Sequence, residues 1–289
     1  MDHVRRLLLL VLVSATACRS ASPKPATAES PPPPPVTTAA EPAKVEPPCA
    51  DGFIDLERWL SEGLLVLGEY HGTEELPRAV AETVCAAAAN GKSAWLALEL
   101  PRDEQPRIDA FLAAGNEAPL LEGPFWRRDY QDGRSSQAML GLLREVRRMR
   151  SAGRDVRVLA YDIPSTGGTA GEDRDAQMAA FVAQARTQAP AEPMVLLVGN
   201  IHATRRLKIP RSMVWHLVKL GVPLKTLNVA SRGGTAWMCG ATCGVAQLAG
   251  EDLGPDRRVL ETPEAAKAGY DGLWYVGTVT ASPPAWKKP

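Results

Sequence analysis

The chain has 289 residues, of which 45% are hydrophobic and 23% are charged, and its 33 Lys and Arg balance its 33 Asp and Glu. This is the composition of an ordinary soluble domain with a hydrophobic core. A net charge of zero argues against a protein that captures nucleic acid, because such capture requires a basic face.

The N-terminus has the pattern of an export signal. Arg5 and Arg6 precede an apolar run at residues 7–17, which is shorter than the about 20 residues of a membrane-spanning helix. The run ends in ATAC, which resembles a bacterial lipoprotein cleavage box with Cys18 as the lipidated N-terminus. Ordinary cleavage that leaves a free Cys18 is the alternative. We expect residues 1–18 to be a signal peptide, and the protein to be exported and lipid-anchored to a bacterial membrane, in the periplasm or at the outer membrane.

A proline-rich segment follows. Residues 19–48 hold ten prolines, five of them consecutive, and too few apolar residues to fold alone. At roughly 3.1 Å per residue, such a segment could hold a domain several tens of Å from a membrane surface. We predict a disordered tether at 19–48 and a single domain at 49–289, attached to the membrane by the lipid only.

Apart from Cys18, the chain has an even number of cysteines, which is expected where disulfides form in an exported protein. Cys239 and Cys243 are close enough in sequence to pair with each other. That leaves Cys49, at the end of the tether, to pair with Cys85. A thiolate metal site at the Cys-x3-Cys pair is the alternative.

Strand-like apolar runs alternate with helical patterns along the domain. Strands are expected at 64–68, 94–98, 156–161, 194–199 and 224–229, and helices at 75–90, 104–114, 136–152, 173–188 and 211–220. Nearly all-apolar strands that alternate with helices predict an α/β fold, with a mainly parallel β-sheet and helices on both faces.

Polar residues gather where the predicted strands end. They are Glu69 and His71 after the first strand, Glu99 after the second, Asp162 after the third, and Asn200 and His202 after the fourth. Ligands bind outside the carboxyl ends of the strands in open parallel sheets, so we expect the site there. If so, the two imidazoles lie within about 8 Å of each other. The alternative is that both histidines only satisfy backbone groups of loops.

Two short motifs carry a resemblance to a known family. The stretches GEYH (68–71) and GNIH (199–202), with an acidic residue closing the strand between them, resemble the EreA/ChaN-like superfamily. It joins ChaN-like haem-binding lipoproteins, erythromycin esterases and TraB/Tiki proteins. GEYHGTEE is closest to the ChaN-like branch, and RDAQMA (174–179) resembles a segment of the esterase branch. Erythromycin esterases usually place two residues between the first Glu and His, whereas only Tyr70 intervenes here, which argues against macrolide hydrolysis.

The resemblance implies hydrolysis in two of the branches. A histidine with a pKa near 6.5 can take a proton from water at neutral pH if another group orients it. We therefore assign His71 as the general base of a hydrolase acting on an ester or amide of a small molecule or peptide. Glu69 or Glu99 would orient His71 and stabilise its imidazolium form.

The other candidates complete this hypothesis. His202 would polarise the substrate carbonyl, and Arg78 or Arg134 would stabilise the developing oxyanion. In a variant, a divalent metal (Mn, Zn or Co) is held by His71, His202 and Glu69, and its open positions bind water. The TraB/Tiki resemblance implies this metal variant, and the esterase resemblance implies the metal-free one.

The third branch implies a different class of function, a haem- or iron-binding lipoprotein without catalysis. In that case Tyr70 or a histidine ligates the haem iron, and Asn200 also contacts the cofactor. Packing of Tyr70 against the neighbouring loop is the competing interpretation. Asp132 and Arg134 are expected to form an ion pair that braces a turn at Gly133.

Overall fold

The computed structural model describes residues 49, 52, 54–165, 173–206 and 211–287. These residues belong to one compact unit, Lys44–Pro289. The predicted signal peptide, Cys18 and the predicted tether lie outside the described residues.

Seven strands form the central sheet, in the order β3-β2-β4-β1-β5-β9-β8. They are β1 (Leu64–Glu69), β2 (Ser93–Pro101), β3 (Asp155–Asp162), β4 (Met194–Gly199), β5 (Lys225–Ala230), β8 (Arg258–Leu260) and β9 (Gly272–Tyr275). Neighbouring strands are parallel except β8, which is antiparallel to β9. The predicted α/β fold with a mainly parallel sheet is confirmed.

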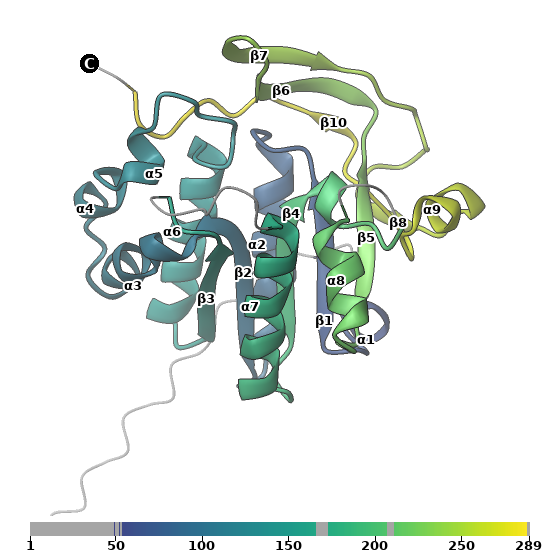
Figure 1. Ribbon diagram of the computed structural model, residues 1–289, viewed down its shortest axis with the longest axis horizontal. Coiled ribbons are helices and arrows are strands. Elements are labelled where there is room, and N and C mark those ends of the chain that lie inside the picture. The colour runs from purple at the N-terminus through teal and green to yellow at the C-terminus, as the bar shows by residue number, and fades with distance from the viewer. Residues whose placement is uncertain (1–48, 50–51, 53, 166–172, 207–210, 288–289) are drawn as a thin grey trace, which may run out of the picture. The chain divides into compact units, whose positions relative to one another are not determined.

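Helices cover both faces of this sheet (Figure 1). They are α1 (Leu56–Trp59), α2 (Glu75–Ala87), α3 (Gln105–Ala114), α4 (Ala118–Leu121), α5 (Pro124–Arg127), α6 (Gln137–Ser151), α7 (Arg174–Gln188), α8 (Met213–Lys219) and α9 (Pro263–Ala268), with 3-10 turns η1 (Arg102–Glu104) and η2 (Asn200–His202). The apolar residues of α1–α6 pack on one face, and those of α7–α9 pack on the other.

Strand β1 shows why the strands of this sheet are apolar throughout. Its residues point alternately to the two faces, so Leu65 and Leu67 enter the core under α2 and α6, whereas Leu64 and Val66 enter the core under α7 and α8. All four side chains are fully buried. A strand covered by helices on both sides has no solvent-facing positions, so polar and apolar residues do not alternate along it.

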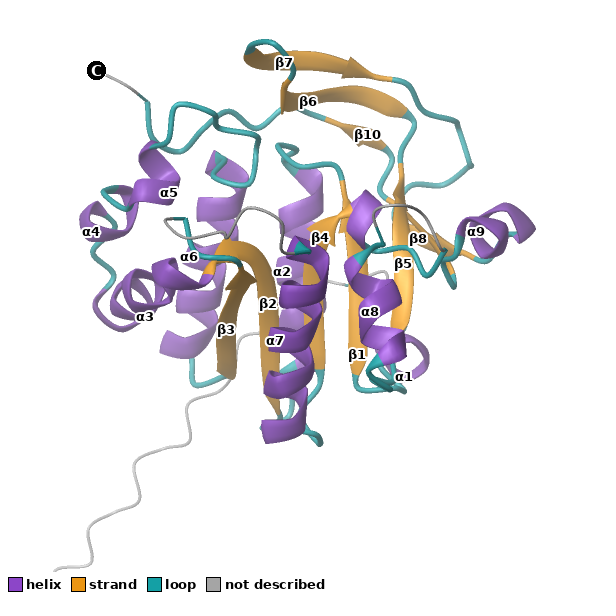
Figure 2. Ribbon diagram, in the orientation of Figure 1, coloured by secondary structure: helices purple, strands orange, loops and turns teal. Residues whose placement is uncertain are grey.

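A second, three-stranded sheet lies above the carboxyl ends of the central strands (Figure 2). It has the order β10-β6-β7, with β6 (Gly233–Cys239), β7 (Cys243–Leu248) and β10 (Thr278–Val279), and we call it the roof sheet. The Trp237 backbone N–H donates to the Gly72 carbonyl at 2.8 Å, which ties the roof sheet to the loop after β1. Gly72 has a φ of +72°, and a Cβ there would collide with the Trp237 carbonyl. The glycine that ends the GEYHG stretch is therefore required by the roof sheet.

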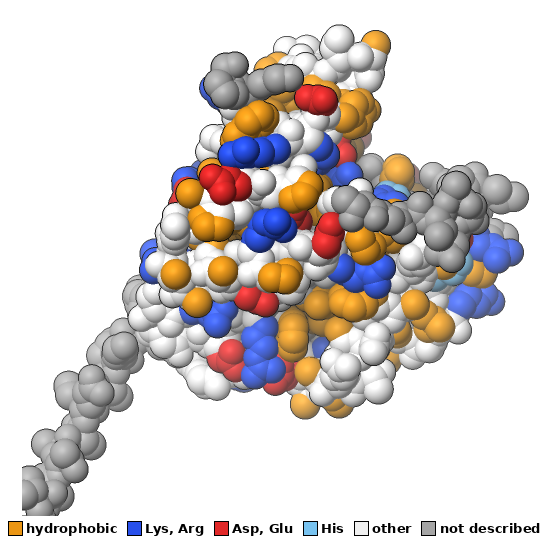
Figure 3. Space-filling view, turned by 60° about the vertical axis from the view of Figure 1, so that its left-hand side comes forward, with side chains coloured by type: hydrophobic (Ala, Val, Ile, Leu, Met, Phe, Trp, Pro, Cys, Tyr) orange, Lys and Arg blue, Asp and Glu red, His pale blue; other side chains and the backbone are white. Residues whose placement is uncertain are grey.

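The structure contains the two predicted disulfides, Cys49–Cys85 and Cys239–Cys243. The thiolate metal alternative at the second pair is therefore wrong, because both of its sulfurs are used in the disulfide. In the described ranges, no helix has the length and apolar character needed to cross a membrane. Basic and acidic side chains are interspersed on the face drawn in Figure 3 rather than separated into patches of one sign.

Candidate active site

A cavity of about 300 Å³ lies at the carboxyl ends of the central strands, beneath the roof sheet. Strands β2, β4 and β1 are neighbours, so the residues that follow them meet at one edge of the sheet. The cavity is lined by Glu69, Tyr70, His71, Glu99, Asp132, Arg134, Arg174, Gly199, Asn200, Ile201, His202, Met238 and Cys239. Apart from Arg78, every residue predicted to act in catalysis or cofactor binding is in this lining.

His71 is held between two glutamates. Its Nδ1 lies 2.8 Å from Glu69 Oε1, and its Nε2 lies 3.5 Å from Glu99 Oε2. An ionised carboxylate only accepts hydrogen bonds, so Nδ1 carries the proton that points to Glu69. Burial by itself lowers the pKa of His71, but the negative charges of Glu99 and Glu69 outweigh it, and the net pKa lies above the ordinary 6.5.

Glu99 is a buried anion with several donors around it. Its Oε2 accepts from the Gly199 backbone N–H at 2.7 Å, and its Oε1 accepts from Arg174 at 2.6 Å and from Arg134 at 3.3 Å. Burial by itself raises the pKa of Glu99. The positive charges of His71 and the two guanidinium groups outweigh this effect, and the net pKa lies well below the ordinary 4.5. Glu99 therefore stays ionised, and it anchors the site rather than donating a proton.

The two arginines are matched by two aspartates. Arg174 forms a bidentate pair with Asp162 at 2.7 and 2.8 Å, and Arg134 Nη1 donates to the same carboxylate at 2.8 Å. Arg134 also binds Asp132 at 2.8 Å, as predicted for the turn at Gly133. Burial opposes ionisation of Asp132, yet Arg134 lowers its pKa to about 2. These pairs fix both guanidinium planes at the cavity wall.

His202 is oriented by a different carboxylate. Its Nδ1 lies 2.6 Å from Asp175 Oδ1, and its Nε2 lies 3.3 Å from Arg174 Nη1. Arginine only donates, so Nε2 accepts from Arg174 and the proton is on Nδ1. In this tautomer His202 has no proton to offer a substrate carbonyl. The geometry therefore does not support the predicted polarising role, and Arg174 is the donor at this position.

The two imidazoles approach one point above Gly199. A Cβ built on Gly199 would lie 2.9 Å from His71 Nε2 and 3.5 Å from His202 Cδ2. The rings therefore lie within the predicted separation of about 8 Å. The missing side chain leaves space next to His71 Nε2, where a reacting atom can be accommodated.

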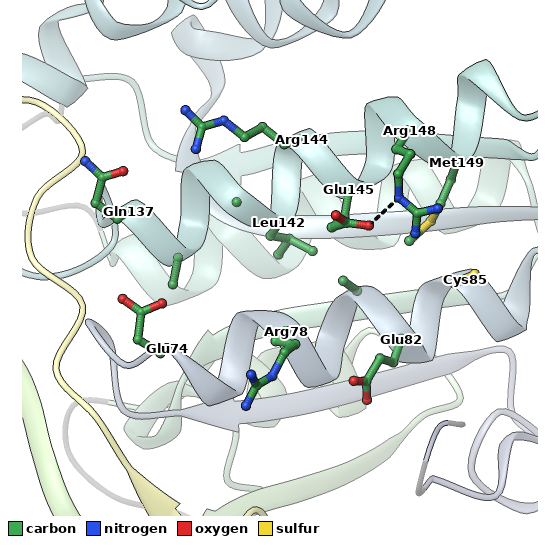
Figure 4. Close-up of a pocket in the computed structure, with 13 residues that line it drawn as sticks. Glu74, Arg78, Glu82, Cys85, Gln137, Leu142, Arg144, Glu145, Arg148 and Met149 are labelled. Carbon is green, nitrogen blue, oxygen red and sulfur yellow. Dashed lines mark hydrogen bonds and ion pairs between the residues drawn. The ribbon is translucent and has the colours of Figure 1, made fainter. Parts of the chain in front are cut away.

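Arg78 lies elsewhere. It is in α2 and lines a groove of about 510 Å³ between α2 and α6, together with residues such as Glu74 and Gln137 (Figure 4). The prediction that Arg78 stabilises an oxyanion is wrong, because the side chain belongs to the groove and not to the cavity. The lining of the groove contains no histidine, although the groove is the larger of the two spaces.

The predicted metal ligands do not fit one ion. Glu69 binds the Nδ1 side of His71, whereas Nε2 faces the cavity, and Arg174 is placed against His202 Nε2. A common metal would need these three side chains to face a single point. Within the part of the chain that the structure describes, no group of three or more His, Cys, Asp or Glu is arranged to hold a metal ion.

The predicted cofactor contacts, Tyr70 and Asn200, both border the cavity. Tyr70 is only partly exposed and packs against the core under α2 and α6, whereas the competing interpretation placed it against the neighbouring loop. The Asn200 carbonyl accepts from the Tyr270 hydroxyl at 2.8 Å, which fixes the turn that follows β4. His216, by contrast, is on α8 and contacts Asp173 at 3.0 Å, outside the cavity.

Arg174 and Asp175 were not predicted as site residues. They occupy the first two positions of α7, where the Asp173 side chain caps the helix by accepting from the Ala176 backbone N–H. This cap fixes the first turn of α7 over the ends of β2 and β4. The RDAQMA stretch begins with these two residues, so the motif contained a signal that could have identified them.

No protein-family model matches the chain, and no curated protein matches it in sequence. Among solved structures, it is similar to an erythromycin esterase mutant, EreC, in its open conformation, with a TM-score of 0.55 and 11% identity over 78% of this chain and 93% of that one. The chain has the EreA/ChaN-like fold. A succinoglycan biosynthesis protein has a TM-score of 0.59 at 10% identity, covering 81% of this chain and 93% of its own. A Bacillus cereus protein has a TM-score of 0.51 at 12% identity, covering 79% and 92%. The fold implied by the sequence motifs is thereby confirmed.

Proposed function

We propose that this EreA/ChaN-like protein is a hydrolase that cleaves an ester or amide bond of a small molecule or peptide with water activated by His71. The observation that carries the proposal is the orientation of His71. Glu69 holds its Nδ1 at 2.8 Å, and Nε2 lies beside Gly199 in the lining of the cavity, which also contains the two guanidinium groups. The structural similarity to an erythromycin esterase supports the same class of reaction.

In the proposed reaction, neutral His71 accepts a proton from water through Nε2 while the water oxygen forms a bond to the carbonyl carbon. The carbonyl π electrons move to oxygen and give a tetrahedral oxyanion. The imidazolium of His71 then donates its proton to the leaving oxygen or nitrogen as the bond to carbon breaks. Glu69 and Glu99 stabilise the imidazolium, which is the reason for their placement at its two nitrogens.

The oxyanion is stabilised by Arg174 and Arg134, since both guanidinium groups line the cavity. Their contacts to Asp162 hold them in place before the substrate binds, so little reorganisation is needed as charge develops. Loss of one such donor typically lowers kcat by roughly 100- to 1000-fold. Arg174 therefore takes the role first considered for His202, and Asp175 holds the His202 ring beside it.

The test is hydrolysis of a panel of aryl and alkyl esters and anilides by the purified domain. His71→Ala is expected to lower kcat/KM by about 100- to 10,000-fold while the far-UV circular dichroism spectrum stays unchanged. His216→Ala is the matched control, because His216 also contacts an aspartate but lies outside the cavity. Turnover that survives His71→Ala would contradict the proposal, as would a folded wild type that hydrolyses no member of the panel.

We also propose that the protein is exported and anchored by lipid at Cys18, with residues 19–48 as the tether. The two disulfides of the domain support export, since such bonds persist in oxidising compartments. Metabolic labelling with a fatty acid should mark the full-length chain but not a Cys18→Ala variant. Equal labelling of both chains would rule out this anchor.

A further inference from the structure

Two exposed apolar side chains border the mouth of the cavity. Ile201 is 66% exposed and Met238 is 41% exposed, and both line the cavity. We call this pair the apolar collar. Only six large hydrophobic side chains are exposed in the described part of the chain. One more of the six, Tyr130, donates from its hydroxyl to the Cys239 carbonyl, next to the collar.

A single exposed apolar residue needs no explanation, but a group of them around a cavity does. Ile201 is in η2, directly before His202, whereas Met238 comes from β6 of the roof sheet. Two elements far apart in sequence thus bring apolar groups to the same opening. The side chain of Met adapts to different ligand shapes because it is unbranched and flexible.

The charged side chains in the wall of the cavity already form ion pairs with one another. Arg134 and Arg174 are paired with the carboxylates of Asp132, Asp162 and Glu99. A carboxylate on a substrate would bring a permanent negative charge to a wall in which three carboxylates already face two guanidinium groups. An uncharged apolar group would instead gain by covering the collar, since apolar surface is then removed from water.

We infer that Ile201 and Met238 determine the specificity of the site, by binding an uncharged alkyl or aryl group of the ester or amide whose carbonyl lies at His71. This inference rests on the proposed hydrolase function and adds the substrate class. Each methylene that covers the collar is expected to raise kcat/KM about fourfold. Selectivity should follow chain length until the collar is covered, and should disfavour a charged group at the same place.

The experiment measures kcat/KM for p-nitrophenyl acetate, butyrate, hexanoate and octanoate, and for the p-nitrophenyl half-ester of succinic acid, which places an anion at the butyrate length. Wild type should prefer the longer chains and should hydrolyse the succinate more slowly than the butyrate. Ile201→Thr combined with Met238→Gln keeps the β-branch at 201, with one heavy atom fewer, and a side chain of similar length at 238, and it makes both groups polar. The octanoate-to-acetate ratio should fall at least tenfold in this double variant.

Val245→Thr is the matched control. Val245 is 63% exposed on β7 of the same roof sheet but is not in the cavity lining, so this change should leave the ratio as in wild type. Hydrolysis without dependence on chain length, or a preference for the succinate, would overturn the inference and leave the proposed function standing. A ratio that persists in the double variant would do the same.

If wild type hydrolyses neither an ester nor an anilide, the proposed function fails, and a binding measurement then tests the apolar collar separately. Saturation-transfer NMR with 2-octanone and acetone reports binding without turnover. The collar predicts stronger transfer to 2-octanone in wild type and in Val245→Thr, and its loss in the double variant. Equal transfer to the two ketones, or transfer unchanged in the double variant, would overturn the inference.

Discussion

Replacing Glu69 with Gln tests what raises the pKa of His71. The substitution keeps the shape and leaves an oxygen to accept from His71 Nδ1, but removes one of the two carboxylate charges beside the ring. A hydrogen bond to a charged partner contributes about 1.5–3 kcal/mol and one to a neutral partner about 0.5–1.5 kcal/mol, so the substitution removes about 1–1.5 kcal/mol, and 1.36 kcal/mol corresponds to one pKa unit. The pKa of His71 should therefore fall by about one unit. The maximal kcat/KM should fall by roughly tenfold, because the imidazolium formed in the reaction loses the charge that stabilises it.

The assay is titration of the His71 ring by NMR, compared with the pH dependence of kcat/KM for the same protein. Asp173→Asn is the matched control, since it removes a carboxylate next to His216, and Asn caps the start of α7 as well as Asp does. The control should leave the pKa of His71 unchanged. An unchanged or higher pKa in Glu69→Gln would refute the assignment of Glu69 as the group that stabilises the imidazolium.

Three further predictions concern the site and the disulfides. Gly199→Ala should lower kcat/KM at least tenfold, because the new methyl group would stand 2.9 Å from His71 Nε2. Its melting temperature should change little, because the φ of −53° at this position suits alanine. Wild-type kinetics in this variant would contradict the prediction. Glu99→Gln should destabilise the fold by about 3–5 kcal/mol in urea unfolding, since it leaves buried guanidinium groups with one counter-charge fewer. In wild type, the depressed pKa of Glu99 means that this stabilisation is present above pH 4.5 and is lost as the pH falls, so a flat stability profile at acid pH would count against it. Thiol titration of denatured, unreduced 49–289 should find almost no free cysteine, and four free thiols would overturn both disulfides.

The parts of the fold with strong periodicity were predictable from the sequence. All five expected strands and all five expected helices exist, with ends within three residues of those observed. The strands are apolar because both of their faces are buried in one sheet, and such apolar runs are visible in a single sequence. The strand ends were predictable for the same reason, and they placed His71, His202 and Glu99 at one edge.

The roof sheet was not predicted. Residues Gly233–Cys239 and Cys243–Leu248 are only partly buried, and their apolar and polar positions do not alternate cleanly. A short antiparallel pair that packs over a cavity has little core to bury, so its sequence carries a weak pattern. The contribution of Met238 to the cavity therefore depended on tertiary contacts, such as the one between Trp237 and Gly72.

Which arginine lies in the cavity was also predicted incompletely, because it depends on the tertiary structure. Arg78 and Arg174 are both near the start of a helix that follows a loop, and in the sequence only the RDAQMA stretch that begins at Arg174 distinguishes them. Arg174 is at the first position of α7 and reaches the strand ends, whereas Arg78 is within the first turns of α2 and turns to the groove against α6. Which arginine reaches the site is decided by its position along the helix and by the space that its side chain enters, and the second depends on the tertiary structure.

The pH dependence of kcat/KM for the most rapidly hydrolysed ester tests the central claim most directly. The neutral form of His71 is the active base, so kcat/KM should rise about tenfold per pH unit and reach a plateau above an apparent pKa higher than 6.5. The same pKa should be found for the His71 ring by NMR in the free protein. A profile that is flat from pH 5 to 9, or one whose apparent pKa differs from that of His71, would contradict the claim that His71 activates the water.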